Sequence, residues 1–396
     1  MTGSRPRPNY YPNRENRAPK SQVREVGSVD YSILLVVTVL VLIGVVMVFS
    51  ASHMIAASRQ IFNHNAYHFL QRNAAFAAVG FFAMVIISFF NYEIIRSFSK
   101  IIYLVAVGLL VAVAVFGFAA GGAQRWLEIP VIGGFQPSEL ARAAVIFIMA
   151  YLVEKHPHAL KTLGGLVYFS AAISIIVVLI VLPGGFTAAL ITAAIGFSMI
   201  FVASPFFWRY VLMGGTAVAA VAGYLAWQAL YGGGSGAFRG ARVTAWLDPF
   251  SDPLDMGFQT IQSLYAIASG GMFGLGIGNS RQASFVPEPH NDIIFAIIVE
   301  ELGLFGAGMI LALFGILIWR GIIVALNAPD TFSSMAAIGI VFAFAYPTII
   351  NVAVVTNTIP NTGVNLPFIS YGGTSLLVSM ALAGVLLNIS RYAKRE

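Results

Sequence analysis

Residues 286–299 read VPEPHNDIIFAIIV, so a polar loop broken by two prolines turns directly into a long apolar run. The prolines exclude a helix before His290, and a side-chain oxygen of Asn291 or Asp292 is expected to cap the helix that follows. An apolar run of this kind is typical of a membrane-spanning segment. An ionisable group at the edge of such a segment indicates a functional site.

The composition of the whole chain points the same way. Of 396 residues, 58% are hydrophobic and only 10% are charged, whereas soluble domains carry roughly a quarter charged residues. The chain is therefore expected to be an integral membrane protein. It has no cysteine, which excludes disulfides and thiolate metal sites. The net charge of +6 is better explained by loop cations facing the cytoplasm than by a nucleic-acid partner, because no basic patch is interleaved with aromatic residues.

Apolar runs long enough to cross a bilayer recur along the chain and predict an all-α polytopic fold with about ten transmembrane helices. They lie near residues 31–50, 70–90, 101–120, 137–154, 163–182, 186–204, 209–230, 293–319, 334–356 and 366–390. Most lysines and arginines fall in the loops that an inside N-terminus would place inside. The even number of crossings then predicts a multi-pass membrane protein with both termini cytoplasmic.

The chain divides into a tail and one membrane domain. Residues 1–29 are polar and rich in Pro, Asn and Arg, which predicts a disordered cytoplasmic tail, and residues 30–396 form the transmembrane domain. A large extracytoplasmic loop, 231–292, connects the seventh and eighth helices. Within it, 259–273 suits an amphipathic helix. The glycine run 270–278 favours a close-packed turn over a nucleotide site, since the dinucleotide glycine pattern is incomplete.

Asp292 is the first candidate for chemistry. Burial and neighbouring carboxylates would raise its pKa, while a helix N-terminus would lower it, and the balance suits a base for proton abstraction. The plainer alternative is that Asp292 only caps a helix. Glu300 and Glu301 follow in the same helix, and one of them is expected to pair with a cation across the bundle.

Two further polar stretches stand beside apolar runs. Pro137 suits the first turn of the fourth span, where Glu139 and Arg142 share a helix face and can form a structural pair. The functional alternative is that Arg142 or Arg125 neutralises an anion, for instance a diphosphate. Residues 366–375, which include Ser370, combine hydroxyls with paired glycines. This pattern favours close helix packing or an interrupted helix lining a cavity.

At these residues the chain resembles the SEDS family (shape, elongation, division and sporulation), which includes FtsW, RodA and SpoVE. The matching stretches are 122–126, 136–139, 245–259, 269–281, 287–303 and 362–375. Residues 46–52 and 247–253 resemble the FtsW/SpoVE branch more than RodA. One departure is Gly184, which stands where the family usually has an acid, so any function of that acid is in doubt here.

The resemblance implies a peptidoglycan glycosyltransferase that polymerises lipid II, the undecaprenyl-pyrophosphate-linked disaccharide pentapeptide, into β-1,4 strands outside the membrane. It also implies a class B penicillin-binding protein as partner and Asp292 as the catalytic residue. No cofactor is firmly expected, although a divalent cation (Mg or Mn) is an alternative to arginine at the diphosphate. The candidates for substrate binding are Arg125, Glu139, Arg142, Gln259, Glu288 and Ser370. The rival hypotheses are a transporter (flippase) of lipid-linked precursor and a scaffold that recruits a synthase.

Overall fold

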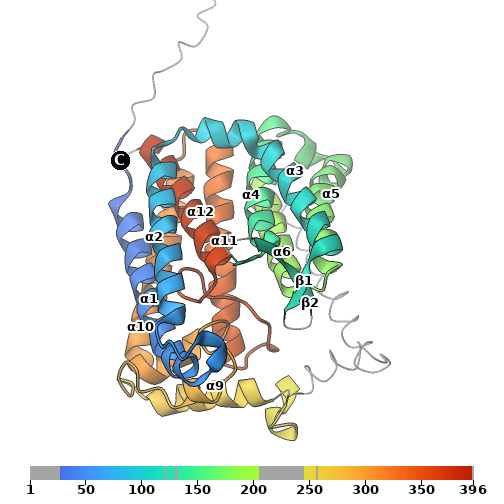
Figure 1. Cartoon of the computed structure of the whole chain (residues 1–396). Coiled ribbons are helices and arrows are strands. Elements are labelled where there is room, and N and C mark those ends of the chain that lie inside the picture. The colour runs from blue at the N-terminus through green and yellow to red at the C-terminus, as the bar shows by residue number, and fades with distance from the viewer. Residues whose placement is uncertain (1–26, 121–122, 130–132, 205–244, 256, 395–396) are drawn as a thin grey trace, which may run out of the picture.

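The computed structural model describes residues 27–120, 123–129, 133–204, 245–255 and 257–394. Within these residues, nine long helices run roughly side by side (Figure 1). They are α1 (Tyr31–Ser58), α2 (His68–Phe89), α3 (Tyr92–Phe116), α4 (Pro137–Lys155), α5 (Leu163–Val181), α6 (Phe186–Ala203), α10 (Ile294–Leu326), α11 (Thr331–Val355) and α12 (Gly373–Tyr392).

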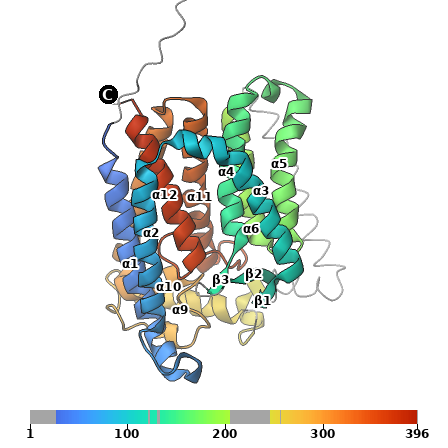
Figure 2. The same ribbon diagram turned by 45° about the horizontal axis from the view of Figure 1, so that its top comes forward.

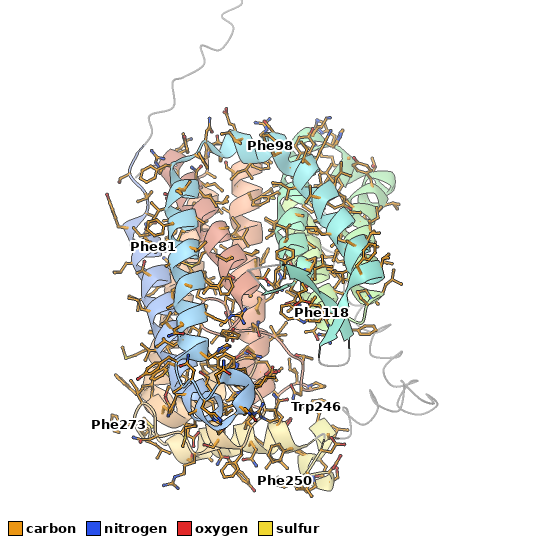
Figure 3. The ribbon with its side chains drawn as sticks, in the orientation of Figure 1. Phe81, Phe98, Phe118, Trp246, Phe250 and Phe273 are labelled. Atoms are coloured by element: carbon orange, nitrogen blue, oxygen red, sulfur yellow. The ribbon has the colours of Figure 1, made fainter. Side chains whose placement is uncertain are left out.

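Eight of the described helices are long and apolar enough to cross a membrane, which confirms a multi-pass helical membrane protein. The remaining long helix, α4, carries Glu139, Arg142 and Glu154 within its apolar run. Large apolar side chains on the outer surface, including Phe81 of α2 and Phe98 of α3, are exposed, as expected for a surface that faces lipid (Figure 3). The predicted span 209–230, most of the predicted tail and residues 231–244 of the loop lie outside the described residues.

The helices form two groups that meet along α4 and α11. In one group α2 packs on α1 and α12, and α10 packs on α1 and α11. In the other, α3, α5 and α6 surround α4. Figures 1 and 2 show both groups, with the shorter helix α9 (Phe258–Gly270) lying across one end of the bundle. The two ends of the described chain meet at the opposite end, where Gly27 N donates to Arg391 O at 2.9 Å.

The third helix begins and ends earlier than predicted. It was expected near 101–120, but α3 begins at Tyr92 because Asn91 caps it by accepting from Glu93 N. A small antiparallel sheet then follows the helix, which was not predicted. Its strands are β1 (Phe118–Ala120), β2 (Ala123–Ile129) and β3 (Gly133–Phe135), in the order β1-β2-β3. Among the described residues, this three-stranded sheet before α4 is the one departure from a helical fold.

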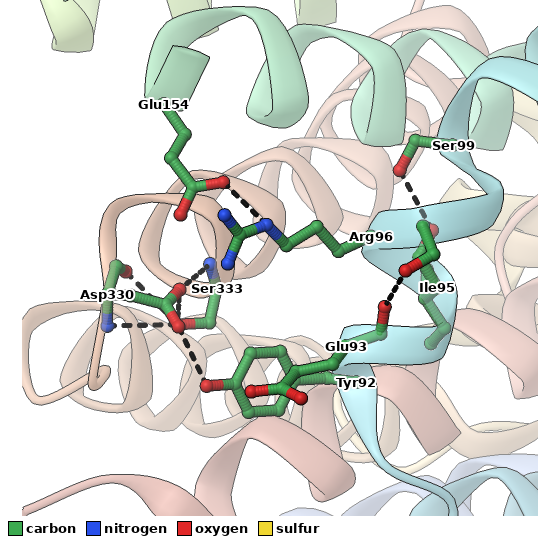
Figure 4. Close-up of polar contacts among 9 residues, drawn as sticks. Tyr92, Glu93, Ile95, Arg96, Ser99, Glu154, Asp330 and Ser333 are labelled. Atoms are coloured by element: carbon green, nitrogen blue, oxygen red, sulfur yellow. Dashed lines mark hydrogen bonds and ion pairs between the residues drawn. The ribbon is translucent and has the colours of Figure 1, made fainter. Parts of the chain in front are cut away.

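The early start of α3 brings charged side chains into contact with neighbouring helices (Figure 4). Arg96 Nε lies 2.8 Å from Glu154 Oε2 at the end of α4. Tyr92 Oη donates to Asp330 Oδ2 at 2.7 Å. Asp330 also caps α11 in a capping box with Ser333. Polar contacts thus join α3, α4 and α11 at this end of the bundle.

The last predicted span, 366–390, is also corrected at its start, since α12 begins only at Gly373. Residues 366–372 instead form a turn that enters the bundle. Phe368 has a φ of 65° there, an unusual value for a bulky residue. Gly44 of α1 allows the turn to approach, because a Cβ at Gly44 would lie 2.5 Å from Phe368 O. The close-packing alternative is supported at Gly373, where an added Cβ would lie 2.6 Å from the Phe76 ring, and a cavity lined by this stretch stays a prediction.

The glycine run after α9 is the close-packed turn that its sequence predicts. Gly271, Gly274, Gly276 and Gly278 all have positive φ. Leu275 N and Gly276 N donate to the carbonyls of Glu300 and Glu301, so the run lies against α10. Residue 303, a glycine with a φ of 71°, interrupts α10 at this contact.

Glu300 and Glu301 anchor the loop that contains this glycine run. The prediction that one of them pairs with a cation is wrong, because neither forms an ion pair with a described residue. Glu300 Oε1 accepts from Arg281 N at 3.0 Å, and its other oxygen accepts from Ser280 Oγ at 2.5 Å. Glu301 accepts from Ser50 Oγ at 2.6 and 2.7 Å. Hydroxyl and backbone N–H groups therefore donate to these carboxylates in place of a cation, since a carboxylate accepts strong hydrogen bonds from such donors.

Candidate functional site

The site is built on the loop before α10. Glu288 has a φ of 50°, a conformation that is uncommon without glycine. Asn291 lies three residues after Glu288, and its Nδ2 donates to Glu288 Oε2 at 2.6 Å. The helix begins at Ile294 with Ile293 at its N-cap position and no side-chain cap. The prediction that Asn291 or Asp292 caps α10 is therefore wrong, because the backbone N–H groups that bear on the Asp292 carboxylate belong to Asp292 and Ile293, which precede the helix.

Two side-chain amides from other elements hold Asp292, and a third amide supports one of them. Gln259 of α9 donates from Nε2 to Asp292 Oδ1 at 3.3 Å. Asn361 Nδ2 in turn donates to Gln259 Oε1 at 2.8 Å. Asn351 of α11 donates to the main-chain oxygen of Asp292 at 2.6 Å. The Asp292 side chain is half-buried, so it keeps contact with the surroundings outside the bundle.

Burial raises the pKa of the Asp292 carboxyl above its ordinary value, and the nearby charge of Glu288 raises it further. Hydrogen bonds to the carboxylate favour its ionised form and lower the pKa in part, the backbone N–H of Asp292 first, then Gln259 and the backbone N–H of Ile293. A carboxylate that is ionised but poorly solvated is a stronger base than one in water. Asp292 therefore has the properties expected of a group that removes a proton from a substrate hydroxyl.

His290 lies two residues away and is neutral. Its side chain is only 3% exposed, and its ring lies 4.2 Å from that of Phe69 and 5.3 Å from that of Tyr371. Burial lowers its pKa from 6.5 to about 4. Its main-chain oxygen accepts from Tyr371 N at 2.8 Å, which ties the Asp292 loop to the turn before α12. The His290 ring thus packs against Phe69 and Tyr371 beside the site.

Ser370, predicted to bind substrate, lies in that turn. Its Oγ accepts from Leu366 N at 2.7 Å, and the side chain is 5% exposed. The hydroxyl oxygen therefore holds the turn in shape. Binding of substrate by Ser370 stays a prediction.

The Glu139–Arg142 pair forms on α4 as predicted, with Pro137 in the first turn. Arg142 Nη2 lies 3.1 Å from Glu139 Oε1, and both side chains are buried. Arg142 Nε has no hydrogen-bond partner among the described residues. Arg125 is half-buried on β2, in the sheet that precedes α4. No hydrogen bond among the described residues joins Arg142 to Asp292, and binding of an anion by Arg125 or Arg142 stays a prediction.

Sequence reasoning missed two residues of the site, Asn351 and Asn361. Asn351 appears in the sequence only as a polar residue within an apolar run, and Asn361 as one of several turn residues. The contact of Asn361 is made with α9, 102 positions earlier in the chain. Periodicity gives no signal for such a contact.

The comparisons with known proteins agree with this architecture. Residues 30–395 match the family of cell cycle proteins that comprises FtsW, RodA and SpoVE. The chain belongs to the FtsW/RodA/SpoVE family. Stage V sporulation protein E of Bacillus subtilis is 37% identical over 93% of this chain and 98% of its own length. A probable peptidoglycan glycosyltransferase FtsW of Geobacter sp. is 37% identical over the same shares of the two chains.

Solved structures share the fold of this FtsW/RodA/SpoVE family member. A chain from a peptidoglycan synthase complex that coordinates polymerization and crosslinking has a TM-score of 0.75 at 24% identity, over 92% of this chain and 98% of that one. The rod shape determining protein RodA of Thermus thermophilus has a TM-score of 0.67 at 22% identity, over 93% and 98% of the two chains. These likenesses establish the arrangement of the helices.

Proposed function

We propose that this protein is a peptidoglycan glycosyltransferase that polymerises lipid II into β-1,4 glycan strands at the outer face of the bacterial cytoplasmic membrane. Family membership and relatives named as glycosyltransferases support the activity. The observation that carries the proposal is the half-buried Asp292 carboxylate, whose pKa is raised by burial and which Gln259 holds at the start of α10.

In the proposed reaction, Asp292 removes the proton from the 4-hydroxyl of the acceptor sugar. The oxygen then attacks the anomeric carbon of the donor, and the bond from that carbon to the lipid diphosphate breaks. The diphosphate leaves with the electron pair, and the anomeric centre is inverted to give a β link. General-base catalysis of this kind typically contributes about 10²–10⁴-fold in rate.

The leaving diphosphate needs positive charge near it. Arg142 suits this task, because it is buried and only its Nη2 is engaged by Glu139. Arg125, which precedes α4, is the second candidate. Gln259 and Glu288 flank Asp292 and are proposed to contact the acceptor sugar or to orient the base, and Ser370 holds the adjoining turn.

A divalent cation would supply charge at the same diphosphate. The described residues contain no group of three or more His, Cys, Asp or Glu side chains that could hold a metal ion. Binding of Mg or Mn at the diphosphate stays a prediction, which the assay below tests with and without divalent ions.

The proposal places the α9 end of the bundle outside the cell and the end where Gly27 meets Arg391 in the cytoplasm. A lipid-linked donor could then keep its tail in the bilayer while its sugars reach Asp292. A class B penicillin-binding protein is the proposed partner, in agreement with the likeness to a chain of a synthase complex that also performs crosslinking.

The test is a polymerisation assay with purified protein and lipid II in detergent, with and without the partner and divalent ions. Glycan strands on a gel are the expected product, because detergent leaves no second compartment to which a transporter could deliver. A protein that makes no strands under any of these conditions, yet moves lipid II across vesicle membranes, would contradict the proposal in favour of the transporter.

A further inference from the structure

The Asp292 carboxylate has two oxygens in different surroundings. Oδ1 accepts from Gln259 Nε2 at 3.3 Å. Oδ2 faces Gly363, where an added Cβ would lie 3.5 Å away, and Gly363 itself is exposed. The backbone N–H groups of Asp292 and Ile293 also bear on the carboxylate. Gln259 therefore engages Oδ1, while Oδ2 lies beside the exposed Gly363, the side from which we expect a substrate hydroxyl to approach.

The Gln259 side chain could face Asp292 in two ways. A primary amide presents N–H groups on one side and an oxygen on the other, so a half-turn of the amide would place Oε1 against the carboxylate. Two oxygen acceptors in contact would repel each other and favour protonation of the acid. Something must therefore fix which end of the amide points toward Asp292.

Asn361 provides that constraint. Its Nδ2 donates to Gln259 Oε1 at 2.8 Å, which requires the oxygen of Gln259 to point away from Asp292. The chain segment around Asn361 is itself fixed, because Asn351 Nδ2 donates both to Asp292 O at 2.6 Å and to Val364 O at 2.7 Å. Asn351 is 1% exposed, so these contacts are formed inside the bundle.

We propose that Asn361 is a positioning residue, which orients the Gln259 amide so that Gln259 donates to Asp292 Oδ1 and leaves Oδ2 to take the substrate proton. This inference rests on the proposed function, in which Asp292 is the base. It changes the assignment of Gln259 from substrate binding to support of the base. It also adds Asn361, which the sequence did not single out.

The test measures lipid II polymerisation against pH for Gln259→Leu, Asn361→Ala, and the double variant. Loss of a hydrogen bond to a charged acceptor should lower kcat roughly tenfold in Gln259→Leu and move the acid limb of the pH profile up by about one unit, with KM unchanged. The charge of Glu288, which raises the pKa of Asp292, is unchanged in every variant. Asn361→Ala should shift the limb in the same direction and by less.

The double variant decides the mechanism. If Asn361 acts only through Gln259, adding Asn361→Ala to Gln259→Leu should change nothing further. Asn361→Leu, which removes the donor but fills the space, should reproduce the shift seen in Asn361→Ala. Asn279→Ala is the matched control, since Asn279 is an exposed asparagine of the same outer region that bonds locally to Leu275 O; its profile should match that of the unaltered protein.

Additive losses, or a lower rate with an unmoved pH profile, would overturn the inference and leave Asn361 as a structural residue. A fully active Asp292→Asn protein would overturn the proposed function and this inference with it. An inactive Asp292→Asn protein, together with unchanged Asn361 variants, would reject the inference alone.

Discussion

Arg142 Nη2 lies 3.1 Å from Glu139 Oε1, one turn apart on α4, and the two side chains are 11% and 10% exposed. Breaking a buried ion pair from one side leaves an uncompensated charge, which typically costs about 3–5 kcal/mol. We therefore expect Glu139→Gln and Arg142→Met each to lower the free energy of unfolding by about this amount. Denaturant unfolding of the purified protein in detergent measures it.

The double variant Glu139→Leu/Arg142→Met separates structure from function. Replacing both charges by apolar groups should restore most of the lost stability. If Arg142 neutralises the leaving diphosphate, the stable double variant should still be nearly inactive. A double variant with normal stability and normal polymerisation would show that the pair is structural only.

His290 should make the protein sensitive to acid. Because burial lowers its folded pKa from 6.5 to about 4, the unfolded state binds the proton more readily in that window. Stability contributed by the neutral ring is thus present above pH 6.5 and is lost as the pH falls toward 4, by on the order of 3 kcal/mol at most. His290→Phe keeps a ring and cannot titrate, so the fall in melting temperature between pH 7 and pH 5 should be smaller in this variant. An equal fall in both proteins would contradict the assignment.

Gly303 and Gly308 lie in the same helix and should respond to alanine in opposite directions. At Gly303 the φ is 71°, and an added Cβ would lie 2.4 Å from Met272 O. Gly303→Ala should therefore destabilise the protein by about 1–3 kcal/mol. At Gly308 nothing lies within 4 Å of the Cβ position. Gly308→Ala should be neutral or stabilise by up to about 1 kcal/mol, because alanine favours a helix. Similar melting temperatures for the two variants would argue against the interruption of α10.

Asp30 has two separable contacts. It caps α1 by accepting from Ser32 N and Ile33 N, and its Oδ2 lies 2.5 Å from Arg320 Nη2. The Arg320 side chain is 38% exposed, so the ion pair should be worth at most about 1 kcal/mol. Asp30→Asn keeps a capping oxygen and should cost no more than that, whereas Asp30→Ala should lose about 1 kcal/mol more. Thermal unfolding of the two variants should therefore separate them. Equal losses would mean that the cap contributes nothing.

Much of the membrane fold could be predicted from the sequence, because a span of about 20 apolar residues is a strong and local signal. Helix ends were less predictable. The start of α3 at Tyr92 is set by the cap at Asn91, and charged side chains in its first turns find partners on α4. The late start of α12 depends on contacts of residues 366–372 with α1 and the Asp292 loop, which hydropathy does not reveal.

Asp292, the proposed base of the candidate site, could be selected from the sequence, whereas the hydrogen bonds that hold it could not. Asp292 stood out because an acid next to an apolar run is costly and therefore informative. Its expected capping function was wrong, because the backbone N–H groups that bear on the carboxylate precede α10. The link from Asn361 through Gln259 joins segments far apart in the chain, so only the folded structure brings them together.

The most direct test of the central claim is lipid II polymerisation by purified Asp292→Asn protein, with its melting temperature recorded at neutral pH. Because burial raises the folded pKa of this acid, its ionisation costs stability as the pH rises above the ordinary value. The account predicts no glycan strands from a variant that melts at the same temperature as the unaltered protein or higher. Strands formed at the unaltered rate would contradict it.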